Sequence, residues 1–436
     1  MHDKNDNKYI TVFINMPTKI KDNESIQPLL NLLEFGKISF SVLDKIPFIY
    51  KVSPKIKSLK KQFIEIQNQS SILTLPDQFN ELFSNEGWIC YGALNQSILE
   101  ESVSLGLDNK IEEAKLLLIN SIDEIFIDLV LKKCGIRKHF KLRVELLKLL
   151  KIDYLEERYH ACIPLLLALI DGLANDISAH IGFFAEKSDL ELFDSITAHK
   201  TGLPFLKILM NSARKNTTTE KIKIPYRNGI LHGRDLNFAN KEVASKCWWA
   251  LASLIEWADE KALNKQPKPP ESFQTILKQH QQTRELSKRI GLWKPRPIQP
   301  KDYWIVQTLE TVVDDSPEFT LLEFLNHWKN KHWGKLPPLL IHNIGKHLGK
   351  ASQEIKSDYQ KSELLNFKII ALEDYTASST RILTNIQYIK NEGIKDTEIN
   401  ITLNYADSTT GSPELRGEKN GRWYVLQLSL GDILFS

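Results

Sequence analysis

The chain has 436 residues, of which 42% are hydrophobic and 25% charged, and its formal net charge at pH 7 is +3. This composition is typical of a globular protein with roughly two to four domains of about 100 to 200 residues each, and so small a net charge argues against a protein coated in nucleic acid. The longest apolar runs, such as Cys162–Ile170, stop well short of the roughly 20 residues that cross a bilayer, so we expect a cytoplasmic protein without a membrane span.

Residues 1–75 are expected to form a partly β N-terminal region whose function the sequence does not indicate. Two runs rich in β-branched and aromatic residues, Tyr9–Ile14 and Ile38–Leu43, predict strands there. The first residues mix charges of both signs and lack the uninterrupted apolar core of a secretion signal.

From Leu75 the pattern becomes helical, and residues 76–263 are predicted to be a helical region. Gly135 follows Lys132 and Lys133 and should end one helix, and a second helix is expected over about 138–150. A longer helix opens near residue 155. Its apolar stripe suits the core of a bundle and consists of Tyr159, Ile163, Leu166, Ile170, Leu173 and Ile177.

The other side of this long helix is more polar than a bundle interior usually is. Asp171, Asn175, Asp176 and His180 lie there, and we expect them to face water or a cleft. Pro164 falls within the same pattern and should either kink the helix or mark its first turn.

Two further helices are predicted at the end of this region, and the first of them carries a polar motif. Pro225 can begin a helix as its first residue, and Asn240 is a good N-cap for a further helix over Lys241–Leu263. That helix carries Trp248, Trp249 and Trp257, which indicate either an interface or a core helix with one amphipathic tryptophan at the surface.

Prolines then delimit a linker, residues 264–301, with a helix inside it. The linker has nine basic residues against two acidic ones. It could track a phosphate backbone, or it could be a solvated spacer helix.

Residues 302–436 are predicted to be an α+β domain, in which helices come first and a meander of strands follows. The last strand is entered through an Asn-Gly turn at Asn420 and Gly421. The expected helices are 321–333 and 337–355, and the expected strands are 366–372, 378–388, 398–405 and 422–428.

Neither cysteines nor histidines indicate a metal site, and no cofactor is expected. The cysteines are widely separated and form no CxxC pair, which excludes a zinc knuckle or a disulfide framework. The histidines of the last domain share no clean helical face, so we interpret them as scattered surface or core residues: His327, His332, His342 and His347.

The segment Tyr226–Asp235, YRNGILHGRD, is the best candidate for a functional site. Arg227 offers a permanently charged fork of donors that suits a phosphate, and His232 can transfer a proton near neutral pH. Together they could cleave RNA without a metal ion, the histidine acting on a 2′-hydroxyl or leaving oxygen and the arginine stabilising charge on the phosphorus centre.

Helical geometry separates these two side chains. Five helical residues advance about 7.5 Å and rotate about 140°, so something else must complete the site, and a second copy of the chain packed against this helix would do so. Asn228 or Asp235 could fix the histidine tautomer, and Gly229 and Gly233 leave a bare strip for a backbone or a ribose. The alternative is a helix N-terminus with a surface arginine and a histidine that is hydrogen-bonded to a neighbour.

The segment of about 122–263, a helical bundle with Arg227, Asn228 and His232 at the head of a late helix, resembles a HEPN domain, whose signature is Arg-x4-6-His. The resemblance implies a metal-independent endoribonuclease that is active as a homodimer with facing motifs and leaves a 2′,3′-cyclic phosphate and a 5′-hydroxyl. Many family members are bacterial toxins or antiviral effectors. Some carry a modifiable tyrosine two residues after the histidine, where this chain has Arg234.

The segment of about 317–430 is similar to NTF2-like domains, in which helices pack on a curved sheet that encloses a pocket or dimerises. The complete prediction is a mainly α protein with a C-terminal α+β domain. Its function is that of a ribonuclease with Arg227 and His232 as catalytic residues, supported by Asn228, Asp235 and Asp171. The alternative is a catalytically silent scaffold that binds RNA or protein and uses the C-terminal domain to dimerise or sense a ligand.

Overall fold

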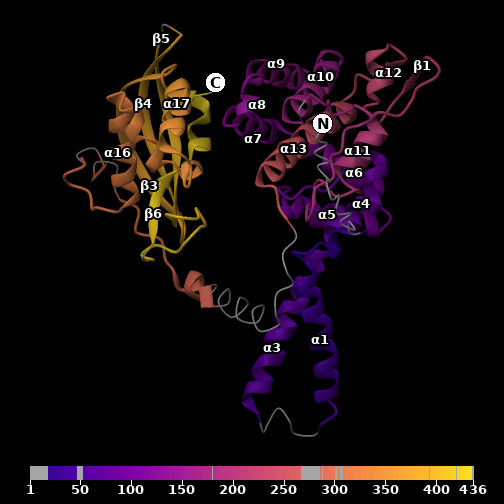
Figure 1. Ribbon diagram of the computed structural model, residues 1–436, viewed down its shortest axis with the longest axis horizontal. Coiled ribbons are helices and arrows are strands. Elements are labelled where there is room, and N and C mark those ends of the chain that lie inside the picture. The colour runs from indigo at the N-terminus through magenta and orange to yellow at the C-terminus, as the bar shows by residue number, and fades with distance from the viewer. Residues whose placement is uncertain are drawn as a thin grey trace, which may run out of the picture. The chain divides into compact units, whose positions relative to one another are not determined.

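The computed structural model describes residues 18–46, 53–178, 180–266, 285–286, 288–299, 303–304, 308–391, 393–418 and 420–434. It divides into two compact units, one made of residues 1–130 and 145–277 and the other of residues 131–144 and 278–436 (Figure 1). The first unit is mainly helical, and the second holds a four-stranded sheet with helices. This confirms a mainly α chain with a C-terminal α+β part.

The helical unit begins with a hairpin of two helices. These are α1 (Gln27–Leu43), which follows the 3-10 turn η1 (Ile20–Asp22), and α3 (Pro54–Gln69). Gly36 lets them come close, because a Cβ there would lie 2.1 Å from the Phe63 ring, and Phe40 packs on the same ring at 5.2 Å between centroids. The strand expected over Ile38–Leu43 is therefore wrong. Its apolar residues continue the helical spacing of α1, and this spacing outweighs their β propensity. The strand expected over Tyr9–Ile14 lies outside the described residues.

The rest of the unit packs around two long helices, α10 (Tyr159–Ile177) and α13 (Lys241–Leu263). Asn240 caps α13 through a 3.1 Å bond from the Val243 N–H, as the sequence predicts. The remaining elements are η2 (Ser70–Leu73), α4 (Leu75–Phe83), η3 (Ser84–Glu86), α5 (Gln96–Leu107), α6 (Ile111–Asn120), α7 (Glu124–Gly135), α9 (Val144–Leu155), α11 (Leu203–Met210), α12 (Arg227–Leu231) and the short parallel strands β1 (Thr218–Lys221) and β2 (Asp235–Asn237).

Both long helices are core helices. Trp248, Trp249 and Trp257 are fully buried, and the indole N–H of Trp249 donates to the Ile89 carbonyl at 2.8 Å. The core-helix alternative for α13 is thus confirmed, but the surface tryptophan expected with it is wrong, because all three are buried. Helix α10 alone among the described helices is long and apolar enough to cross a membrane, and its apolar stripe is buried within the bundle from Tyr159 to Leu173. Pro164 lies inside this helix.

The second unit is an antiparallel meander in the order β3-β4-β5-β6, with helices packed against it. The strands are β3 (Glu363–Thr376), β4 (Ser379–Lys390), β5 (Gly393–Asp407) and β6 (Gly421–Val425); the helical elements are α8 (Lys138–Lys141), α16 (Pro317–Lys329), η4 (Trp333–Lys335), η5 (Pro337–Leu339), η6 (Ile341–Asn343), α17 (Leu348–Tyr359), η7 (Gln427–Leu430) and α18 (Gly431–Leu434).

All four predicted strands are present, and two predicted helices are not as expected. Residues 337–339 and 341–343 form two 3-10 turns, and α17 begins only at Leu348, because Pro337, Pro338 and Gly345 interrupt the helix. The helix expected over 138–150 is divided into α8 and α9 at Leu142 and Arg143. The sheet core is built from alternate residues of β4, which runs buried at every second position from Thr380 to Tyr388.

Candidate functional site

The motif lies on a short helix with a well-defined end. Helix α12 begins after Tyr226, and its C-cap is His232. Gly233 has φ +65°, its N–H donates to the Ile230 carbonyl at 3.1 Å, and the next N–H reaches the Gly229 carbonyl at 2.7 Å. This is the Schellman pattern, in which a left-handed glycine ends a helix. Gly233 therefore fixes where the chain turns after His232.

The loop after this helix is anchored by a buried ion pair. Asp235 is 0% exposed, and Arg214 donates from Nε to both of its carboxylate oxygens at 3.1 Å while its Nη2 lies 3.0 Å from Oδ1. Arg214 also lies over the Tyr226 ring, 4.5 Å from its centroid. Asp235 thus stabilises the motif through Arg214, and not by a bond to the His232 ring.

Gly229 is needed for that ion pair. A Cβ at this position would lie 1.8 Å from Asp235 Oδ2, and Gly229 itself is buried. The expectation that Gly229 leaves a bare strip for a ligand is therefore wrong, because the carboxylate of Asp235 fills the space. At Gly233 nothing lies within 4 Å of an added Cβ.

Arg227 occupies the first position of α12 and has a neutral partner. Its Nη1 donates to Asn228 Oδ1 at 3.0 Å, and its guanidinium lies 5.7 Å from the Phe184 ring centroid. Asn228 is held in turn by its Nδ2, which donates to the carbonyl and side-chain oxygens of Asn211 at 3.1 and 3.2 Å. Within the described part of the chain, no carboxylate forms an ion pair with Arg227.

Arg227 faces a pocket of about 310 Å³ whose other polar walls come from α10 and the segment that follows it. Its lining residues are Asp171, Gly172, Asn175, His180, Gly182, Phe184, Ala185 and Arg227. Of the polar residues that the sequence places opposite the apolar stripe of α10, three line this pocket, which confirms the cleft alternative for them.

The pocket wall is partly preorganised. Asp171 Oδ1 accepts a 3.0 Å bond from the Phe184 N–H, and Gly182 permits this approach because a Cβ there would lie 2.5 Å from the same oxygen. Asn175 Oδ1 is buried without a hydrogen-bond partner in the structure. Such an acceptor is available to a ligand hydroxyl or amide, because a buried polar atom left unpaired costs about 1–3 kcal/mol.

His232 lies outside this lining. Its side chain is exposed, and it occupies the end of α12 opposite to Arg227. The two candidate catalytic residues thus diverge on one chain, as the five-residue spacing predicts. The structure brings Arg227 and Asp171 to one pocket, with Asn228 hydrogen-bonded to Arg227 but outside the lining, and it leaves His232 exposed outside the lining as well.

Three residues of this site were not predicted as site residues from the sequence. Arg214 anchors Asp235, Asn211 holds Asn228, and Phe184 packs under Arg227. They come from the segments before and after α11, and a hydrogen bond between such segments leaves no periodic signal. Of these three residues only Phe184 has a local signal in the sequence, because it forms an apolar pair with Phe183 directly after Gly182.

Other residues suited to metal or thiol chemistry are not assembled in the described residues. No group of three or more His, Cys, Asp or Glu side chains is placed there to hold a metal ion. The four cysteines are buried and unpaired by disulfides, and burial raises the pKa of the Cys134 and Cys162 thiols to about 12. The thiols are therefore protonated at neutral pH and unreactive.

The histidines of the sheet unit are less scattered than expected. His327 lines a pocket of about 560 Å³ together with Glu323 and Arg422, and its Nδ1 lies 3.4 Å from that of His332. Burial lowers the pKa of His327, and Glu323, 3.7 Å away, opposes that shift.

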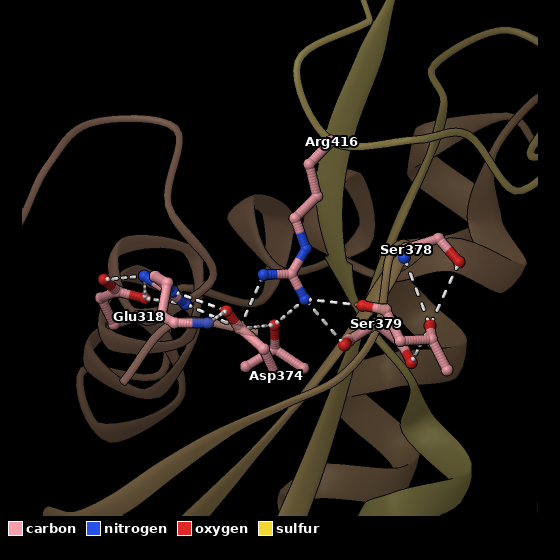
Figure 2. Close-up of polar contacts among 8 residues, drawn as sticks. Glu318, Asp374, Ser378, Ser379 and Arg416 are labelled. Atoms are coloured by element: carbon pink, nitrogen blue, oxygen red, sulfur yellow. Dashed lines mark hydrogen bonds and ion pairs between the residues drawn. The ribbon is translucent and has the colours of Figure 1, made fainter. Parts of the chain in front are cut away.

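A second arginine cluster in the sheet unit has a different character (Figure 2). Asp374, whose side chain is 1% exposed, lies 2.9 Å from Arg296 Nε and 2.7 Å from Arg416 Nη1. Arg296 also contacts Glu318 at 3.0 Å, and Thr380 donates to Asp374 at 2.9 Å. Each arginine here is neutralised by a carboxylate.

Comparison of the chain with protein-family models, with curated proteins and with solved structures found no match.

Proposed function

We propose that the chain is a metal-independent endoribonuclease of the HEPN type, acting as a bacterial toxin or antiviral effector. The observation that carries this proposal is the state of Arg227. Its guanidinium faces a polar pocket and is bound to an amide oxygen, not a carboxylate. An arginine in that state can bind a phosphate without first losing an ion pair.

The chemistry assigned to these residues is transesterification. A base removes the proton of the 2′-hydroxyl, whose oxygen attacks phosphorus, while an acid protonates the leaving 5′-oxygen. Cleavage leaves a 2′,3′-cyclic phosphate and a 5′-hydroxyl. His232 is the residue that transfers a proton, and Arg227 stabilises the charge on the phosphorane. Asn228 positions the Arg227 guanidinium through the 3.0 Å bond between them.

Two copies of the chain are required by this scheme. One histidine cannot be base and acid on opposite sides of the phosphorus at the same time, and His232 is not among the residues that line the pocket that Arg227 faces. A homodimer in which the two motifs face each other would supply two histidines and two arginines around one phosphate.

The finer architecture forms part of the same proposal. The helices α9 to α13 of the helical unit, with the motif on α12 just before the last of them, have the order expected of a HEPN-type bundle. The four-stranded meander preceded by α16 and α17 has the order expected of an NTF2-like cone.

The test is RNA cleavage by the purified chain in the presence of EDTA, with the products sequenced for new 5′-hydroxyl ends. We expect His232→Ala and Arg227→Ala each to lower the rate by roughly a factor of 10² to 10⁴. His160→Ala, which removes an exposed histidine of α10, is the matched control and should cleave like the wild type. Absence of cleavage by the wild type, or equal cleavage by all variants, would refute the proposal.

A second candidate is a catalytically silent RNA- or protein-binding scaffold, and the exposed position of His232 outside the pocket favours it. Mixing the Arg227→Ala and His232→Ala chains separates the two functions. A composite site regains activity in mixed dimers, whereas a scaffold binds RNA without producing new ends.

A further inference from the structure

The pocket that Arg227 faces also holds a carboxylate, that of Asp171. Both side chains line one cavity of about 310 Å³, which is at the lower end of the range of about 300–1,000 Å³ for small-ligand sites. The lining carries one negative formal charge, from Asp171, and one permanent positive charge, from Arg227. A ligand that satisfies both needs an anion at one end and hydrogen-bond donors at the other. A nucleotide, with a phosphate and a base joined through ribose, has two such ends.

The carboxylate of Asp171 is held in place but keeps most of its capacity to accept hydrogen bonds. Its Oδ1 accepts the 3.0 Å bond from the Phe184 N–H, and its Oδ2 has no hydrogen-bond partner among the residues that the structure describes. A carboxylate oxygen has two lone pairs, so Oδ1 can accept a second bond. A Cβ at Gly182 would lie 2.5 Å from Oδ1 and 3.3 Å from Oδ2. The glycine therefore leaves the carboxylate uncovered on that side.

One turn further along α10, Asn175 adds a second acceptor to the same wall. Residues four apart lie on the same side of a helix, and both Asp171 and Asn175 line the cavity. Asn175 Oδ1 is buried and has no hydrogen-bond partner in the described part of the chain. Buried acceptors in folded proteins are nearly always paired. This wall of the pocket is thus short of donors, which a ligand would supply.

The pattern of donors on each RNA base decides which base suits a carboxylate. Guanine has two adjacent donors on its Watson–Crick edge, N1–H and the N2 amine. Adenine and cytosine each place an amino donor beside an acceptor nitrogen, and uracil has one N–H between two carbonyl oxygens. An ionised carboxylate only accepts hydrogen bonds, so an acceptor atom that faces it is repelled. Asp171 therefore favours guanine over the other three bases.

We propose that this pocket binds a guanosine nucleotide of the RNA substrate. Asp171 accepts hydrogen bonds from N1–H and the N2 amine of the base, and Arg227 binds the phosphate. Asp171 is thereby the residue that sets base specificity. The inference rests on the proposed function, because it places one base of the RNA beside the phosphate at which cleavage occurs.

The first test is the binding of mononucleotides to the purified chain, measured by isothermal titration calorimetry. GMP should bind at least about tenfold more tightly than AMP, CMP or UMP, because only guanine pairs with both carboxylate oxygens. IMP is the matched ligand, since it keeps N1–H and O6 and lacks only the N2 amine. It should bind at least about fivefold more weakly than GMP. Equal affinities for GMP and IMP, or no binding of GMP at millimolar concentration, would overturn the proposal.

Asp171→Asn tests the carboxylate itself. The variant keeps an oxygen for the Phe184 N–H and puts an amide donor in the place of Oδ2, and such an amide pairs with the edge of adenine or cytosine. The affinity for GMP should fall at least about tenfold, and that for AMP or CMP should rise by roughly twofold to fivefold. An equal loss of affinity for every nucleotide would show a merely structural role and contradict the proposal.

Glu186→Gln is the matched control for this variant. It removes the same charge from an exposed position next to Ala185, which lines the pocket, but Glu186 itself is outside the lining. Every nucleotide should bind to it as to the wild type. If Glu186→Gln weakened GMP binding as much as Asp171→Asn does, the effect would come from the overall charge of this surface and the assignment of Asp171 would be wrong.

The sites of RNA cleavage separate this inference from the proposed function. New 5′-hydroxyl ends should lie next to guanosine for the wild type, and Asp171→Asn should lose that preference. Cleavage without a base preference at the cut would refute guanosine recognition and leave the nuclease function standing. Selective binding of GMP without any cleavage would instead refute the nuclease function and support the pocket as a guanosine nucleotide site.

Discussion

The pocket beside α12 and the cluster around Asp374 both contain arginines, but they use them in opposite ways. Arg296 and Arg416 each form an ion pair with the buried Asp374. Arg227 has only the amide oxygen of its neighbour Asn228 as a hydrogen-bond partner within the described residues. Burying a charge is costly unless it is paired, so the first arrangement stabilises structure and the second leaves a cation available for an anion.

The helical unit contains both arrangements within one loop. Arg214 neutralises Asp235 and thereby anchors the segment after α12, while Arg227 at the start of α12 has no carboxylate partner among the residues that the structure describes. One arginine therefore holds the loop in place, and the other is held ready to bind. The difference indicates that partner chemistry, rather than residue type, marks the functional arginine.

The largest effect on stability is expected at Asp374. Asp374→Ala leaves Arg296 and Arg416 without their shared carboxylate, and breaking a buried ion pair of this kind costs about 3–5 kcal/mol. The measurement is hydrogen exchange of the β3 to β5 amides in urea. Asp396→Ala, at an exposed position of β5, is the control and should change the free energy of unfolding by less than about 0.5 kcal/mol. Equal effects of the two changes would contradict the assignment.

The same cluster predicts a pH dependence. Burial alone would raise the pKa of Asp374, but the hydrogen bonds from Arg296 and Arg416 outweigh it and hold the pKa well below 3.8. A carboxyl with a lowered folded pKa stabilises the fold above its unfolded value of about 3.9 and loses that contribution as the pH falls toward the folded pKa. The difference in unfolding free energy between wild type and Asp374→Asn should thus be constant from pH 7 to about pH 4 and shrink below it. A constant difference down to pH 2 would contradict this.

Local signals in the sequence predicted much of this fold. The N-cap at Asn240, the end of α7 at Gly135 and the four strands of the meander each depend on residues that are adjacent or periodic in the chain. The N-terminal helices show the limit of such signals. Ile38–Leu43 has β-branched residues, yet its place in α1 is set by packing against Phe63 of α3.

The candidate site was predictable only in part for the same physical reason. Arg227, Asn228 and His232 are close in sequence and were recognisable as a motif, and the polar side of α10 suggested a cleft. The pairing of Arg214 with Asp235 joins residues that are 21 positions apart, and the need for Gly229 depends on that pair. Contacts of this kind follow from tertiary packing, which one sequence does not display.

A smaller effect is expected at Asp235, where the comparison between the two clusters can be sharpened. Asp235→Asn keeps the shape but removes the charge that holds Arg214, which is 32% exposed. We expect a loss of about 1–3 kcal/mol in unfolding free energy, less than at Asp374, because one arginine loses its carboxylate here and two lose theirs at Asp374. Cleavage should also fall by about tenfold, since a displaced loop misplaces Arg227 and His232. Unchanged cleavage with reduced stability would show that Asp235 does not position the motif.

The smallest effect is expected at Gly233, which ends α12 at a position where a side chain would have room. Its φ of +65° is the reason for a glycine here, because an added Cβ would have no atom within 4 Å. Gly233→Ala should therefore cost about 1 kcal/mol, the strain of a left-handed alanine, and Gly233→Asn should cost less because asparagine tolerates that conformation. Gly229→Ala is the contrasting change, since its Cβ would collide with Asp235 Oδ2 at 1.8 Å. Thermal unfolding of the three variants should rank Gly229→Ala as the least stable and Gly233→Asn as the most stable. Gly233→Asn could instead be as damaging as Gly229→Ala. In that case side-chain contacts, and not backbone conformation, would hold the turn after His232. The loop would then not be anchored separately from Arg227, which contradicts the assignment of Arg227 as the arginine that is free to bind phosphate.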